Sequence, residues 1–273
     1  MQTISRKWEG RNGIMQAANN VAASVEQVAN DLTIGDLGRA LRAGLADFLA
    51  RPLFGLFFAS IYVAAGLFLF VALMRWGEPM WFVPAVAGFP LIAPFTAVGL
   101  YEVSRRREAG LPIGWGAVLG ALRGRGDEQL IMMGGIVFVA FSFWMIIAHG
   151  IFAIFLAESG VGSESLAAFA TPEGMAMLAA GTLVGAILAL AFYAVTVVSL
   201  PMLVDREVDF LTAIIASLAA FRANMAMLCV WAAVIAASLL VAMLPAFLGL
   251  LIVLPVFGHA TWHLYRRIVG QVG

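Results

Sequence analysis

The chain has 273 residues, of which 63% are hydrophobic and 12% charged, and its formal net charge is zero. A soluble domain needs about a quarter of its residues charged to cover its surface, so this composition excludes an ordinary soluble fold and indicates a protein embedded in lipid. The basic residues do not cluster on a soluble domain, and we expect no nucleic-acid partner. The single cysteine, Cys229, excludes an intramolecular disulfide, and its apolar surroundings favour a packing residue over a nucleophile.

The N-terminal part of the chain is polar and then becomes amphipathic. Residues 1–35 predict a cytoplasmic arm, and residues 36–273 predict the membrane domain. Within Asp36–Arg51 an apolar stripe at helical spacing consists of Leu37, Leu41, Leu45 and Phe48. This pattern is typical of a helix at the membrane surface. The first long apolar run begins after Pro52, so we expect an uncleaved internal anchor.

Six apolar runs are each long enough to cross about 30 Å of hydrocarbon as a helix of roughly 20 residues. They are approximately Leu53–Met74, Trp81–Val103, Leu130–Ala157, Gly174–Val204, Ala226–Leu244 and Phe247–Tyr265. Pro94, Pro201 and Pro255 lie inside three of these runs. Each proline predicts a kinked or broken helix, because it removes a backbone donor from the helical ladder.

The charges of the connecting segments predict the orientation of the chain. Fifteen of the sixteen basic residues fall in the N-terminal arm, in the second-to-third and fourth-to-fifth connections, and at the C-terminus. The three opposite connections carry only Arg75. Cytoplasmic loops of membrane proteins are enriched in lysine and arginine, so both termini are expected in the cytoplasm.

The six runs read as three hairpins, each preceded by an amphipathic interfacial helix. Pro94 and Pro255 each precede an Arg-Arg pair by eleven residues, in LIAPFTAVGLYEVSRR and LIVLPVFGHATWHLYRR. The surface segments ALRAGLADFLARP and AIIASLAAFRANM also align. These matches predict a threefold internal repeat over about 36–110, 111–207 and 208–273, with chance similarity between apolar helices as the alternative. The predicted fold class is an all-α polytopic membrane protein with six transmembrane helices.

Three segments closely resemble a bacterial family of uncharacterised integral membrane proteins. They are IGDLGRALRAGLADFLARPLFGLFFASIYVAAG (Ile34–Gly66), SLPMLVDREVD (Ser199–Asp209) and LGLLIVLPVFGHATWHLYRR (Leu248–Arg267). The family is a domain of unknown function, and some members are labelled putative cytochrome c oxidase subunits. The resemblance implies a six-span protein of the bacterial inner membrane, and it supplies no catalytic residue.

His259 and His263 are the most conspicuous candidates for chemistry. Their i,i+4 spacing places both imidazoles on one face of the last helix, in the cytoplasmic third of the span. Asp205, Glu102 and Tyr101 are expected at the same depth. Two readings remain open: a structural hydrogen-bonded cluster, which we favour, and a metal site that needs further ligands. Asp205 follows Pro201 by four residues as His259 follows Pro255, so we expect these two side chains to meet.

A second set of candidates is basic. Five arginines close the second and sixth runs, and we expect them to bind lipid headgroups of the bilayer. They are Arg105, Arg106, Arg107, Arg266 and Arg267.

Two functions follow from these patterns. The first is a non-catalytic inner-membrane protein that assembles or modulates another membrane complex, a respiratory one on the label of some relatives. The alternative is a small transporter or channel with a path between the proline-kinked helices. An enzyme is disfavoured, because no outer loop exceeds about sixteen residues. Three histidines are too few for a haem–copper subunit, and we expect no cofactor and no resident metal. The sequence sets no oligomeric state.

The predicted orientation can be tested with topology reporters. Fusions at Arg106, Arg206 and the C-terminus should give a cytoplasmic signal, because these positions lie in the basic connections. Fusions near Gly77 and Gly162 should give a periplasmic signal. A periplasmic signal at Arg206 would overturn the six-span arrangement and, with it, the repeat.

Overall fold

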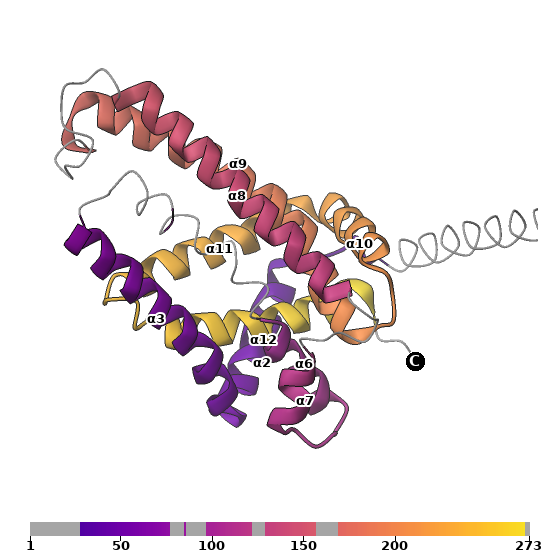
Figure 1. The fold of residues 1–273 in the computed structure, drawn as a ribbon. Coiled ribbons are helices and arrows are strands. Elements are labelled where there is room, and N and C mark those ends of the chain that lie inside the picture. Colours follow the sequence, from indigo (N-terminus) through magenta and orange to yellow (C-terminus); the bar gives the residue numbers. More distant parts are fainter. Residues whose placement is uncertain (1–27, 77–84, 86–96, 122–128, 157–168, 271–273) are drawn as a thin grey trace, which may run out of the picture.

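The computed structural model describes residues 28–76, 85, 97–121, 129–156 and 169–270, and all of its regular structure there is helical (Figure 1). The helices are α2 (Ile34–Ala50), α3 (Pro52–Trp76), α6 (Val98–Glu108), α7 (Trp115–Gly120), α8 (Gln129–Leu156), α9 (Pro172–Asp205), α10 (Phe210–Ala223), α11 (Met225–Met243) and α12 (Leu250–Val269). The all-α prediction is therefore confirmed for the described residues.

Four of these helices are long and apolar enough to cross a membrane. They are Pro52–Trp76, Ile131–Phe155, Pro172–Asp205 and Met225–Met243, which correspond to the first, third, fourth and fifth predicted runs. The second run lies mostly outside the described residues, as does Pro94. The sixth run forms α12, which is not among the four, because His259, His263 and the two terminal arginines make it more polar. The described residues thus give four candidate spans.

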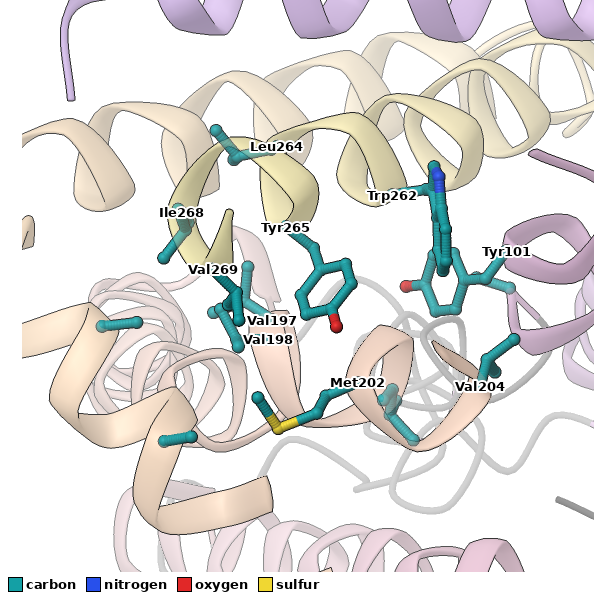
Figure 2. Packing of buried hydrophobic residues seen from close by; sticks show 14 of the residues in the cluster. Tyr101, Val197, Val198, Met202, Val204, Trp262, Leu264, Tyr265, Ile268 and Val269 are labelled. Atoms are coloured by element: carbon teal, nitrogen blue, oxygen red, sulfur yellow. The ribbon is translucent and has the colours of Figure 1, made fainter. Parts of the chain in front are cut away.

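The last helix is the centre of the packing. α12 contacts α2, α3, α6, α9 and α11, and in Figure 1 it lies between α2 and α3 on one side and α11 on the other. Its C-terminal half buries Trp262, Leu264, Tyr265 and Ile268. Figure 2 shows Trp262 beside Tyr101 of α6 and Tyr265 pointing toward Met202 of α9, and all four side chains belong to one apolar cluster. Contacts of this kind stabilise a helix bundle in lipid through close packing, because the surrounding lipid is itself apolar.

α2 approaches α12 closely at Gly44, which has no side chain. A Cβ atom on Gly44 would lie 2.5 Å from the backbone nitrogen of Ala260, so only glycine fits at this crossing. The buried face contains Leu37, Ala40, Gly44 and Phe48, together with Asp36 and Asp47. Of the predicted apolar stripe, Leu37 and Phe48 are buried, whereas Leu45 is 42% exposed on the outer face of the helix.

The chain enters α2 through a capping box. The Thr33 hydroxyl accepts from the Asp36 backbone N–H, and the Asp36 carboxylate accepts from the Thr33 N–H. The preceding residues are also fixed, since the Ala29 N–H donates to the Ile268 carbonyl at 2.8 Å. Asn224 binds the same segment through the Leu32 N–H and the Ala29 carbonyl. The end of the predicted N-terminal arm therefore packs on the bundle, whereas residues 1–27 lie outside the described part of the chain.

Pro201 and Pro255 both lie inside continuous helices, α9 and α12, and the kinks predicted at these prolines stay predictions. The ladder of α9 is nevertheless opened just before Pro201. Ser217 of α10 donates to the Ala194 carbonyl at 2.7 Å and accepts from the Val198 N–H at 3.2 Å, so its hydroxyl is inserted between these two groups. A side chain inserted in this way is a recognised cause of helix bending, and here it joins α10 to α9.

The order of short and long helices matches the predicted three-unit plan. α2 precedes α3, α7 precedes α8, and α10 precedes α11. α10 turns small residues such as Ala216 and Ala220 toward the protein. Larger apolar residues of α10, which include Ile214 and Leu218, form a stripe that is half-buried. This arrangement leaves the stripe available to lipid, and the threefold repeat stays a prediction.

The α2–α12 crossing gives a stability prediction. Gly44→Ala should destabilise the protein by about 1–3 kcal/mol, because the new methyl group has no space against the α12 backbone. Gly38→Ala on the same helix is the matched control, since a Cβ atom there meets nothing within 4 Å. The control should be neutral or stabilising by about 0.5–1 kcal/mol. Unfolding in detergent measures both, and equal effects would contradict the proposed close packing.

Candidate functional site

Asp47 lies on the buried face of α2 and binds three donors from two other helices. Its side chain is only 2% exposed. Oδ2 accepts from Ser104 Oγ of α6 at 2.5 Å and from His263 Nε2 of α12 at 2.8 Å, while Oδ1 accepts from the Arg107 guanidinium of α6. A buried carboxylate is tolerated only when it is paired and hydrogen-bonded. This one carboxylate therefore joins α2, α6 and α12.

His259 extends this arrangement into the protein interior. Its side chain is completely buried, and its Nδ1 lies 2.7 Å from Ser104 Oγ. The i,i+4 spacing does place both imidazoles on one face of α12, as predicted, and each reaches the same carboxylate, directly or through Ser104. We call Asp47, Ser104, Arg107, His259 and His263 the Asp47 cluster.

The pKa of Asp47 depends on its hydrogen-bond partners in the Asp47 cluster. Burial alone would raise the pKa of Asp47, but hydrogen bonds from His263, Ser104 and Arg107 outweigh it and lower the pKa to about 2. A carboxyl group whose folded-state pKa is depressed stabilises the fold above its unfolded pKa. The contribution of Asp47 is therefore present above about pH 4 and is lost as the pH falls toward 2.

Asp205 belongs to a separate group at the C-terminal end of α9. Its Oδ2 accepts from the Tyr265 hydroxyl at 2.8 Å and from Arg266 at 3.0 Å. Arg266 also binds Glu108 of α6, which accepts from Trp262 Nε1 at 3.0 Å. The predicted contact between Asp205 and His259 is therefore not formed. Tyr265 reaches Asp205 of α9, whereas His259 reaches Ser104 of α6 and His263 reaches Asp47 of α2.

Glu102 and Tyr101, the other members of the predicted cluster, also lie elsewhere. Glu102 accepts hydrogen bonds from Arg105 and Arg106 at 2.7 Å, so both of its ion pairs lie within α6. Tyr101 is buried in the apolar cluster with Trp262 (Figure 2). The direction of each side chain separates these residues from the histidines, and their common depth in the membrane stays a prediction.

The five arginines predicted to bind lipid headgroups all bind carboxylates of the protein. Besides the pairs already described, Arg267 binds Asp36 and Asp31, each at 2.9 Å. Hydrogen bonds from Thr33, Arg39 and Arg267 hold the pKa of Asp36 well below its ordinary value, although burial of the carboxyl group acts to raise it. The arginines thus connect the ends of α2, α6, α9 and α12. Contact of the same residues with lipid stays a prediction.

Sequence reasoning missed Asp47, Ser104 and Glu108. One signal was available for the first of these: Asp36, Ala40, Gly44 and Asp47 recur at intervals of three or four residues, so the acids share a face with small residues. Small residues mark a close helix contact, and an acid among them needs a partner on the opposing helix. Ser104 gives no comparable signal, because its role depends on where α6 crosses α2 and α12.

The described residues contain no group of three or more His, Cys, Asp or Glu side chains arranged to hold a metal ion. In the Asp47 cluster the acceptor oxygens of Asp47 are directed at Ser104, His263 and Arg107. Both carboxylate oxygens of Asp47 are therefore engaged in hydrogen bonds or ion pairs with other side chains of the protein.

An all-helical chain with four candidate spans and buried ion pairs between helix ends defines a multi-pass integral membrane protein. Residues 82–205 match the family described as "Predicted integral membrane protein (DUF2189)", whose function is unknown. The match confirms the resemblance to an uncharacterised membrane family. It spans α6 to α9 and leaves out α2 and α12, including the His259–His263 segment. No curated protein and no solved structure matches the chain.

A double-mutant cycle tests the Asp47 cluster. Asp47→Asn and His263→Ala should each destabilise the protein by about 1–3 kcal/mol or more, because each leaves a buried partner without its hydrogen bond. The double variant should cost less than the sum of the singles, with a coupling energy of about 0.5–3 kcal/mol in detergent unfolding.

The matched control is Asp205→Asn combined with His263→Ala. These residues share no hydrogen-bond partner among the described residues, so their effects should add to within about 0.5 kcal/mol. Additivity in the Asp47–His263 cycle, or strong coupling in the control, would contradict the assignment of partners.

Proposed function

We propose that this protein is a non-catalytic component of the bacterial inner membrane that packs against another membrane complex and assembles or modulates it. In this proposal the chain crosses the membrane six times: the second predicted run and α12 are spans in addition to the four candidate spans. Both termini then lie in the cytoplasm. The distribution of basic residues along the sequence supports this orientation. The label carried by some similar proteins makes a respiratory complex the first partner to test.

The observation that supports a partner most directly is the α8–α9 hairpin. α8 packs mainly on α9, and in Figure 1 the hairpin extends away from α2, α3 and α12. Large apolar side chains remain exposed along α8, among them Phe138, Phe143, Ile146 and Ile154. Association of helices in a membrane depends on packing of such surfaces, because lipid is already apolar. A long apolar hairpin anchored only near its base is therefore suited to pack against the helices of another protein.

The interfacial position proposed for α2 has separate support. Its outer face exposes Ile34, Leu45 and Leu49, and Leu53 continues this apolar stripe at the start of α3. Arg42 and Arg51 are exposed beside it. An apolar stripe flanked by arginines fits the boundary between acyl chains and anionic headgroups.

A small transporter or channel is the second candidate, and one observation favours it. The hydroxyl of Ser217 from α10 is inserted into α9, which also contains Pro201. Thr196 and Ser199 of α9 donate their hydroxyl protons to backbone carbonyls one turn earlier in the same helix. A loosened, hydroxyl-rich helix segment is a common feature of transport pathways. This candidate predicts that a transported solute stabilises the purified protein in the absence of any partner.

Photo-crosslinking distinguishes these candidates. A crosslinking residue at Phe143, which is 59% exposed, should capture a subunit of an inner-membrane complex in intact cells. The matched control is the next residue, Trp144, which is buried against Gly185 of α9 and should capture only the chain itself. Affinity purification in mild detergent then identifies the captured complex. Lipid adducts alone at Phe143, or the same products at both positions, would contradict the proposed association.

A further inference from the structure

The hydrogen bonds of the Asp47 cluster determine the protonation of His259. The ionised carboxylate of Asp47 can only accept, so the single hydroxyl proton of Ser104 must point to Oδ2 at 2.5 Å. The 2.7 Å contact between Ser104 Oγ and Nδ1 of His259 can then be made only if Nδ1 carries a proton and donates it. Neutral His259 is therefore the Nδ1–H tautomer, and Nε2 presents its lone pair.

The lone pair of Nε2 faces the protein interior. The His259 side chain is completely buried, and Nε2 has no hydrogen-bond partner among the residues that the structure describes. At the other end of the cluster, His263 is 24% exposed and lies 2.8 Å from the same Asp47 oxygen. The cluster thus runs from a solvent-accessible imidazole to a buried one through a carboxylate and a hydroxyl.

We propose that His259, Ser104, Asp47 and His263 form a proton relay between the interior of the helix bundle and the surface at the end of α12. The three donor–acceptor distances along it, from 2.5 to 2.8 Å, are all those of direct hydrogen bonds. The relay goes beyond the proposed binding role and does not depend on it.

The transfer balances in protons. When a hydronium ion protonates Nε2 of His259, the Nδ1 proton moves to Ser104 Oγ as the Ser104 hydroxyl proton moves to Asp47 Oδ2. One N–H and one O–H bond break while two O–H bonds form, and the positive charge on the imidazole and the negative charge on the carboxylate are both neutralised. In the resting state His263 Nε2 donates its proton to Asp47 Oδ2, so this ring must first exchange protons with water. The exposed ring gives its Nε2 proton to water and takes a proton from water at Nδ1. Nε2 then accepts the proton from Asp47 Oδ2 while Nδ1 releases its proton to water, which restores the resting state of His263.

The charged groups around the relay leave Asp47 as the acceptor that faces Ser104. Arg107 stays bound to Oδ1 of Asp47 throughout, so the carboxyl group keeps one fixed donor while Oδ2 exchanges protons. Of the neighbouring charges, Glu102 is occupied by Arg105 and Arg106, and Arg266 and Arg267 bind Asp205, Glu108, Asp36 and Asp31. The acceptor that faces Ser104 is therefore Asp47.

Nuclear magnetic resonance of the full chain labelled with nitrogen-15 histidine tests the relay. The chain has only three histidines, so substitution of His149, His259 or His263 in turn assigns every signal. The wild-type protein should show His259 with a protonated Nδ1 and an unprotonated Nε2. Exchange of its N–H proton with water should be at least tenfold slower in Ser104→Ala, because the hydroxyl that passes the proton is gone.

Two further variants and a control separate a relay from a structural contact. Ser104→Thr keeps a hydroxyl and should retain both the tautomer and fast exchange, which also covers the case in which Ser104→Ala fails to fold. His263→Gln should keep the tautomer and slow the exchange, because only the exit is removed. Ser217→Ala removes an equally buried hydroxyl between α9 and α10 and should leave His259 unchanged. An Nε2–H tautomer, or exchange that is equally fast in Ser104→Ala and His263→Gln, would overturn the proposal.

Discussion

The packing of this protein depends on the burial of one carboxylate. Asp47 lies where α2, α6 and α12 meet, and an unpaired charge in that place would cost several kcal/mol. The fold meets this cost with donors from both neighbouring helices, so the three helices must hold one relative position for all of the hydrogen bonds to form. Gly44 is required for the same reason, because only a residue without a side chain lets α2 approach the α12 backbone closely enough.

The carboxylate–arginine pairs repeat this principle at the other helix ends. Asp205 and Glu108 share Arg266, and Asp36 receives Arg267. Isolated ion pairs exposed to water contribute little, whereas pairs that are partly buried and shared between several helices fix geometry. The basic residues that the sequence assigns to the cytoplasmic side therefore also have a structural role, since they connect four helices that would otherwise touch only through apolar surfaces.

Composition and periodicity were sufficient to predict the helical class and the four helices that are candidate spans. Long apolar runs such as Pro172–Asp205 carry that information locally. The partners were not predictable, because Asp47 and His263 are 216 residues apart and their contact depends on how α2 crosses α12. The expectation for Asp205 and His259 used matched offsets from two prolines, which give the depth of a residue but not the side of the helix that it faces.

The position of α12 at the end of the chain has a consequence for biosynthesis. A ribosome completes every other described helix before α12, yet α12 supplies His263, Tyr265, Arg266 and Arg267 to carboxylates on the earlier ones. Until it emerges, Asp36, Asp47 and Asp205 lack these partners, and the Gly44 face of α2 has nothing to pack against. Chains that are truncated before α12 therefore keep only some of the partners of these acids, such as Arg107 for Asp47 and Arg39 for Asp36, and leave the Gly44 face of α2 uncovered.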